Sequence, residues 1–128
     1  MNGTMFLNIT IDNNWSNYKY TTDAGILDEI ITQNRLQEDR EMNHSNVKAK
    51  FIELIAKYID THQVLPVKGA VQFISKLRAI NNVTITIATG GWKESAKMKL
   101  KSAGIDYNGI PIASSSDHFS RTEIMKLS

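Results

Sequence analysis

The 128-residue sequence has no cysteine, only two prolines and seven glycines, and no apolar run of membrane-spanning length. Without cysteine, disulfide frameworks, thiolate metal sites and cysteine nucleophiles are excluded. The scarcity of proline and glycine leaves little room for flexible linkers. The N-terminus has no basic stretch followed by an apolar one, as a signal peptide would. We therefore predict a cytoplasmic protein that has no membrane partner.

The charge is small overall but unevenly placed. Hydrophobic residues make up 41% and charged residues 22%, which is typical of a globular domain. Residues 1–65 contain six Lys or Arg and nine Asp or Glu, giving −3, whereas residues 66–128 contain nine and four, giving +5. The change of sign near Pro66 predicts two sub-regions. The basic second half would attract a phosphate group or a nucleic acid.

Hydrophobic periodicity predicts mostly helices, with short strands between the helices of the second half. The candidate helix caps are Asp23, Ser45, and Ser120 with Glu123 in a capping-box pattern. Gly104 stands where a glycine commonly follows a helix. The predicted elements are a strand over 5–11, helices from 25 to about 39 and over 47–59, 68–80 and 92–103, strands over 83–88 and 110–113, a connection over 38–44, and a last helix after 120. Alternation of helix and strand in the second half is typical of a parallel sheet covered by helices.

The most informative segment runs from Ile85 to Trp92 and reads ITIATGGW. A buried strand ends at Thr89, two glycines follow, and Trp92 opens a helix. Ligands of open α/β sheets bind beyond the carboxyl ends of the strands. The Thr89 hydroxyl and the free N–H groups of the helix start would hold a phosphate oxygen, and Gly90 and Gly91 would let the backbone approach. The alternative is an ordinary strand-to-helix turn, with Trp92 either lining a substrate pocket or sealing the helix to the sheet.

A second segment, 113–121, also lies between a strand and a helix. Arg121 in this position would pin a phosphate group or a carboxylate. A cation at the start of a helix opposes the helix dipole, so this placement favours a function. The alternative is that Ser120 caps the helix and Arg121 is merely exposed in its first turn.

Together, ITIATGGWKESAKMKLKSAGI and IPIASSSDHFSRTEIM resemble the haloacid dehalogenase-like hydrolases, most of which are phosphatases. Thr89 matches the family's phosphate-binding Thr or Ser, and Arg121 matches the Lys or Arg that steadies the nucleophile and the phosphate. The resemblance implies an α/β fold with an incomplete Rossmann-like parallel sheet core, flanked by helices, and an inserted helical cap. It implies a first core strand remnant over 1–11, the cap over 12–65 and the remaining α/β core over 66–128.

The family's first motif is Asp-x-Asp-x-Thr, in which the first Asp attacks phosphorus and the second is the general acid/base. The chain opens Met1-Asn2-Gly3-Thr4, which resembles the end of this motif, with Asn2 at the second Asp. The resemblance places the nucleophile before Met1 and the acidic pair that holds Mg²⁺ beyond Ser128. A neutral amide at Asn2 would coordinate but would not transfer a proton. Asp23 resembles a cap-loop residue that faces the active site, the alternative being a helix N-cap.

The resemblance therefore implies a Mg²⁺-dependent phosphatase of small phosphorylated metabolites, weak or inactive in this chain, with no metal ligand among its own residues. The alternative is a non-catalytic remnant that binds a ligand, a second copy of itself or a completing subunit. Lys93, Lys97 and Lys101 form a basic stripe, but no aromatic residues are interleaved with it. The stripe is more typical of a solvated helix face, and nucleic acid is not the partner we predict.

Overall fold

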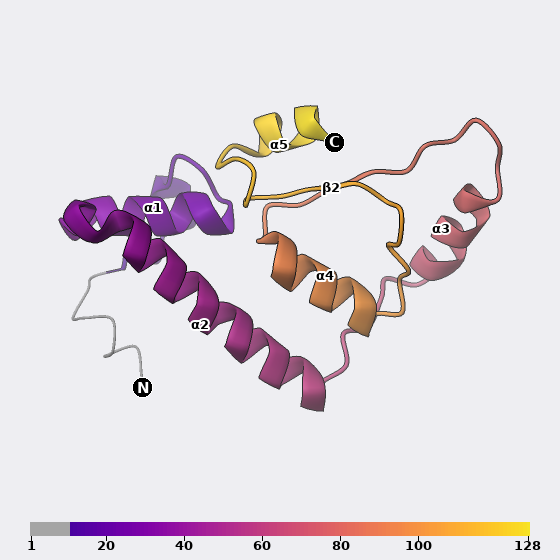
Figure 1. The fold of residues 1–128 in the computed structure, drawn as a ribbon, viewed down its shortest axis with the longest axis horizontal. Helices are drawn as coiled ribbons and strands as arrows, with labels where there is room; N and C mark the ends of the chain where they lie inside the picture. Colours follow the sequence, from indigo (N-terminus) through magenta and orange to yellow (C-terminus); the bar gives the residue numbers. More distant parts are fainter. Residues whose placement is uncertain (1–10) are drawn as a thin grey trace.

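Helices dominate residues 11–128, which are the residues that the computed structural model describes (Figure 1). Asn2 and nearly all of the predicted strand over 5–11 lie outside this range. The elements are the 3-10 turns η2 (Trp15–Asn17) and η3 (Gln37–Asp39), the helices α1 (Asp23–Gln33), α2 (Arg40–Thr61), α3 (Ala70–Arg78), α4 (Lys93–Ser102) and α5 (Arg121–Leu127), and the strands β1 (Ile87–Ala88) and β2 (Ile112–Ala113). No helix within these residues combines the length and the apolar character needed to cross a membrane.

The strands β1 and β2 form a parallel pair, with Ile87 opposite Ile112. The backbone N–H of Thr89 extends the pairing by donating to the carbonyl of Ala113 at 3.0 Å. Helix α4 connects the two strands, so this part of the chain is one strand–helix–strand unit, as predicted. The predicted strand over 83–88 pairs only at its end, and within residues 11–128 the sheet has no third strand. The protein is therefore a mixed α/β protein that is mostly helical.

Helix α1 is capped by Thr22 rather than by Asp23, so the N-cap prediction is wrong by one residue. Thr22 has extended backbone angles, and its hydroxyl accepts the N–H of Gly25 at 3.1 Å. The same hydroxyl donates to the carbonyl of Phe119 at 2.7 Å, and the residue is fully buried. A hydroxyl can make both bonds at once, whereas a carboxylate only accepts. The cap of α1 is therefore also a tether to the segment before α5.

Helix α2 begins at Arg40, so the predicted connection over 38–44 and the predicted cap at Ser45 are wrong. Asp28 on α1 forms an ion pair with Arg40 and a 3.1 Å hydrogen bond with His44. Residues four apart lie on one face of a helix, so these contacts hold the first turns of α2 against α1. The polar sequence there looked like a loop because its partner lies in another helix.

Helix α4 ends as predicted, with Gly104 at a positive φ of 78°. The N–H of Gly104 donates to the carbonyl of Lys101, and the N–H of Ile105 donates to the carbonyl of Leu100. This is the Schellman pattern, for which glycine is favoured. The start of α5 is predicted less well. Ser120 is its N-cap but makes no side-chain cap bond. The capping box is also not closed from the other side, since Glu123 pairs with Lys126 and the Ser120 N–H donates to His118.

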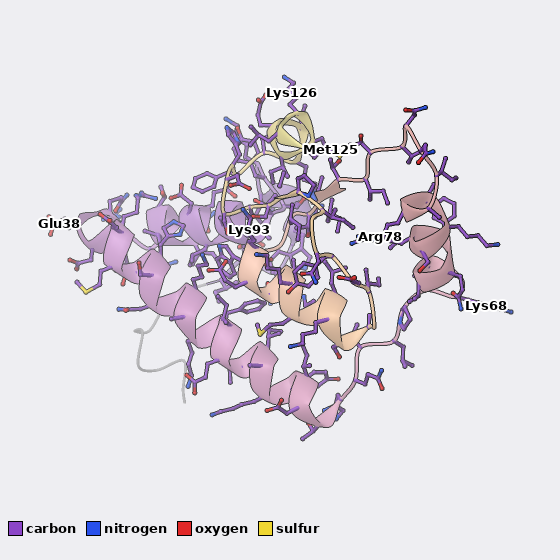
Figure 2. All side chains as sticks on the ribbon, turned by 45° about the vertical axis from the view of Figure 1, so that its right-hand side comes forward. Glu38, Lys68, Arg78, Lys93, Met125 and Lys126 are labelled. Atoms are coloured by element: carbon purple, nitrogen blue, oxygen red, sulfur yellow. The ribbon has the colours of Figure 1, made fainter. Side chains whose placement is uncertain are left out.

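Helix α3 stands apart from the other helices, at the end of two extended segments (Figure 1). Arg78 reaches from α3 to the segment between α4 and β2, where it donates to the carbonyls of Asp106 and Asn108 (Figure 2). The side chain of Phe73 is 62% exposed. The predicted helix over 68–80 is thus present but shorter, and its apolar face is only partly covered.

The hydrophobic core joins α1, α2 and α4, which pack side by side in Figure 1. Trp92 lies at its centre, 6% exposed, with the ring of Phe51 set edge-on at 5.3 Å between ring centroids. Such an edge-to-face pair adds about 0.5–1.5 kcal/mol to the area buried. The core residues are Ala24, Leu27, Ile31 and Trp92, with Leu36, Val47, Phe51 and Phe119 packed around them. The core therefore draws on both sides of residue 65 and holds the start of α1 against the end of β1.

Candidate functional site

Most of the predicted site residues converge at the carboxyl end of β1. The exceptions are the ring of Trp92, which faces the core, and Asn2, which lies outside the described residues. Thr89, Gly90 and Gly91 form the turn from β1 to α4. Asp23 reaches this turn from α1, and Arg121 reaches it from α5. Asp23 and Arg121 are far apart in the sequence, so it is the fold that brings both of them to this turn.

Arg121 lies directly against Gly90. A Cβ atom on Gly90 would be 2.7–2.8 Å from the Cζ, Nη1 and Nη2 atoms of Arg121. Only glycine leaves room for so close an approach. The Nη2 atom also donates to the carbonyl of Thr21 at 3.2 Å. Among residues 11–128 the guanidinium has no carboxylate partner. Its charge is therefore held beside the turn and is available to an anion.

Thr89 and Gly90 supply two hydrogen-bond donors beside this cation. The Thr89 hydroxyl accepts the N–H of Gly91 at 3.1 Å, and its own proton has no acceptor within the described chain. The N–H of Gly90 likewise has no acceptor there. A cavity of about 80 Å³ opens at this point, lined by Ala88, Thr89, Gly90, Arg121, Ile124 and Met125. Small-molecule pockets measure about 300–1,000 Å³, so this one has room for a single small anion rather than a metabolite.

Two of the N–H groups at the start of α4, which the sequence predicted to be free, are occupied. The Oδ2 atom of Asp23 accepts the N–H of Trp92 at 3.2 Å, and the Oγ atom of Ser116 accepts the N–H of Lys93 at 3.2 Å. Side chains from other elements thus satisfy these donors, as a helix end requires. For these two N–H groups the prediction of free donors is wrong, so neither is available to an anion.

Asp23 joins α1 to the turn at two points. Its carboxylate accepts the N–H of Trp92, and its own N–H donates to the carbonyl of Gly90 at 2.8 Å. A Cβ atom on Gly91 would be 3.4 Å from the Oδ2 atom of Asp23. The residue therefore faces the turn, and it is a structural link between α1 and α4.

Trp92 seals α4 to the core, which is one of the two roles that the sequence left open. Its ring is buried against Phe51 and does not line the cavity beside Thr89. It does line a larger cavity of about 590 Å³ between α1, the start of α2 and the segment after β2.

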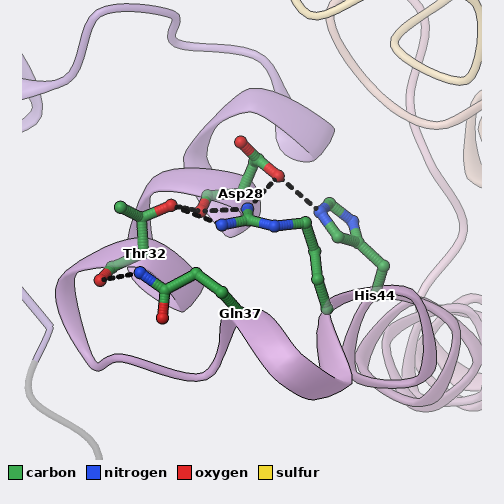
Figure 3. Close-up of polar contacts among 5 residues, drawn as sticks. Asp28, Thr32, Gln37 and His44 are labelled. Atoms are coloured by element: carbon green, nitrogen blue, oxygen red, sulfur yellow. Dashed lines mark hydrogen bonds and ion pairs between the residues drawn. The ribbon is translucent and has the colours of Figure 1, made fainter.

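Sequence reasoning missed the polar residues around this larger cavity (Figure 3). Asp28 binds both Arg40 and His44, and Arg40 also donates to the Thr32 hydroxyl at 2.9 Å. Ser115 is 3% exposed, and its hydroxyl has no hydrogen-bond partner within the described chain. The spacing of Arg40 and His44, four residues apart, was the signal that could have revealed this cluster.

An ion pair at the edge of the larger cavity fixes the charge of one carboxyl. Lys48 on α2 lies 2.8 Å from Glu94 on α4, nitrogen to oxygen. The hydrogen bond from Lys48 lowers the pKa of Glu94 below its usual value, against the opposing effect of partial burial. Glu94 is therefore ionised at neutral pH, and Lys48 has its own carboxylate partner.

Within residues 11–128, no group of three or more His, Asp or Glu side chains is placed to hold a metal ion. The carboxylate beside the turn, that of Asp23, is occupied by a backbone N–H. The described residues therefore do not fit the Mg²⁺ centre that the resemblance implies.

No family model matches the chain, and no curated protein or solved structure gives a significant match. The fold and the site define a mixed α/β protein with a cationic turn at the end of its first described strand.

Proposed function

We propose that this chain binds the phosphate group of a small phosphorylated molecule at the turn formed by Thr89, Gly90 and Arg121. The observation that carries the proposal is the guanidinium of Arg121, which lies against Gly90 with no carboxylate partner in residues 11–128. A guanidinium presents parallel N–H groups that match two phosphate oxygens. The free donors of Thr89 and Gly90 lie on the same cavity.

The proposal includes kinship with the haloacid dehalogenase-like hydrolases, with an incomplete Rossmann-like core and a helical cap. Two features support it. The turn follows a strand of a parallel pair, which is where open α/β sheets bind ligands. Helix α1, from the proposed cap, is tied to that turn through Asp23. A phosphorylated metabolite also suits the predicted cytoplasmic location.

Binding and hydrolysis make different demands on the site. Phosphoryl transfer to a carboxylate needs a free nucleophile and neutralisation of the phosphate charge, which Mg²⁺ supplies in this family. Thr89 and Arg121 would position the phosphate group and neutralise part of its charge, but neither side chain is a carboxylate nucleophile. The described residues therefore support phosphate binding, and hydrolysis becomes the second arm of the test.

The direct test is calorimetric titration of the purified chain with phenyl phosphate, comparing wild type with Arg121→Ala. We expect the variant to bind about tenfold to a hundredfold more weakly, because a hydrogen bond to a charged group contributes about 1.5–3 kcal/mol. Lys101→Ala removes one positive charge from the exposed face of α4 and is the matched control. Equal binding by wild type and Arg121→Ala, or equal loss in both variants, would contradict the proposal.

The second arm measures release of phosphate from the same ester with Mg²⁺ and with EDTA. Mg²⁺-dependent release that Arg121→Ala abolishes would extend the proposal to a phosphatase. Binding without release would establish a phosphate-binding protein of this fold. Circular dichroism of each variant verifies that the helices are retained.

A second candidate function, association with a protein partner, is favoured by apolar exposure around α3. The side chains of Leu65 and Val67 are each 81% exposed, and Phe73 is 62% exposed. Exposed apolar groups of this kind commonly mark interaction surfaces. Sedimentation velocity over a range of concentrations tests self-association. If the wild type sediments as a monomer at every concentration, self-association through this surface is excluded.

A further inference from the structure

The larger cavity is a second site, separate from the turn that carries Arg121. It measures about 590 Å³, within the range of about 300–1,000 Å³ typical of small-molecule sites. It shares no lining residue with the cavity beside Thr89. Its lining includes Asp28, Glu38, Glu41, Trp92, Ser115 and Phe119. We propose that it binds a small organic cation: an amine or guanidine joined to an apolar or aromatic body.

The hydroxyl of Ser115 is a buried polar group on the wall of this cavity. This side chain is 3% exposed, and its Oγ atom has no hydrogen-bond partner among residues 11–128. Neighbouring hydroxyls are partnered, since Ser114 accepts the N–H of Ser116 and Ser116 accepts the N–H of Lys93. Buried polar atoms in proteins are almost always paired, so an unpaired one beside a cavity points to an external partner. A serine hydroxyl can accept from an ammonium group.

The charges around the cavity indicate that the ligand is positively charged. Each cation lining it already has a carboxylate partner, Arg40 with Asp28 and Lys48 with Glu94. Glu38 and Glu41 have no cationic partner within the described chain. Glu38 lies just before the start of α2 (Figure 2). A cationic ligand would pair with these carboxylates, whereas an anion would have to displace Asp28 or Glu94.

Aromatic side chains supply the complementary surface for the body of the ligand. Trp92 and Phe119 line the cavity, and the ring of His44 stacks on Phe119 with 6.2 Å between ring centroids. Aromatic faces attract cations and also cover apolar groups. Asp28 fixes His44 and Arg40 in place (Figure 3), so this wall is formed before a ligand arrives.

The test uses 2-phenylethylamine as the probe and 3-phenylpropionate as its anionic counterpart. Both are titrated into the full chain while backbone amide resonances are recorded. We expect the amine to bind with a dissociation constant of about 1 mM or below, as is usual for fragments of this size. Shifts should centre on Ser115 and the start of α2. Tighter binding of the carboxylate, or no saturable shift by either probe, would overturn the proposal.

Variants test separately the contact of the ligand with the two glutamates and its contact with Ser115. The double change Glu38→Gln with Glu41→Gln should weaken amine binding about fivefold, since each exposed pair contributes a fraction of the total. Asp60→Asn, an exposed carboxylate farther along α2, is the matched control and should not change it. Ser115→Ala should weaken binding without loss of thermal stability, because it removes an unpaired hydroxyl. Unchanged amine binding in both cavity variants would refute the site.

Discussion

The guanidinium of Arg121 lies so close to Gly90 that no side chain fits between them. A Cβ atom on Gly90 would meet the Cζ atom of Arg121 at 2.7 Å. Residues from the end of a strand and from a helix that follows much later are thus in contact. This relationship connects the two segments in which the sequence predicted phosphate contacts.

Gly90→Ala should displace the end of Arg121 rather than prevent folding, because the obstructing atoms belong to a flexible side chain. We expect the free energy of unfolding to change by less than about 1 kcal/mol, and phenyl phosphate affinity to fall about tenfold. Urea unfolding and calorimetry measure the two quantities. In an Arg121→Ala background the same change should cost no further affinity, since it acts through Arg121. Additive losses would contradict this coupling.

Asp23→Ala should lower the free energy of unfolding by about 1–2 kcal/mol, because the Trp92 N–H would lose its part-buried acceptor. Asp23→Asn retains an acceptor oxygen and should recover more than half of that loss. Chemical denaturation of both variants provides the comparison. Hydrogen exchange at the Trp92 amide should accelerate only in Asp23→Ala. Equal effects of the two changes would show that the charge, rather than the hydrogen bond, matters.

Ser115→Ala should raise the free energy of unfolding by up to about 1 kcal/mol, since a buried hydroxyl without a partner carries a desolvation cost. Ser114→Ala is the matched control, and it should destabilise, because the Ser114 hydroxyl accepts the Ser116 N–H at 3.1 Å. Thermal unfolding of both variants tests the contrast. A lower melting temperature for Ser115→Ala would mean that the hydroxyl is already bonded.

The buried Tyr18 should make the protein sensitive to alkali. Burial raises the pKa of its hydroxyl above 10.0, and the nearby Asp12 and Glu29 carboxylates act in the same direction. A raised pKa means that the folded state favours the neutral phenol, so this stability is complete below pH 10 and is lost as the pH rises further. Tyr18→Phe should therefore flatten the fall in stability above pH 10, measured by urea unfolding at pH 8 and pH 11. An unchanged alkaline fall in the variant would refute the assignment.

Local sequence was enough to predict most helices and the strand–helix–strand unit. The alternating pattern before Thr89 and the glycine at position 104 both act within a few residues, so their structural meaning can be read along the chain. The predictions failed where a partner lies elsewhere. The start of α2 depends on Asp28, twelve residues before Arg40, and the cap of α1 depends on Phe119, 97 residues away.

The amino-acid sequence by itself determined the helix periodicity, the glycine-rich turn and the candidate phosphate contacts at Thr89 and Arg121. Only the tertiary structure decided which of these groups are free. In the fold, the Trp92 N–H donates to Asp23, 69 residues away, and Arg121 has no carboxylate partner in residues 11–128. It also left Ser115 unpaired beside a cavity. The reason is physical: propensity acts between neighbours, whereas the pairing of a donor or a charge depends on whatever packing brings within about 3 Å.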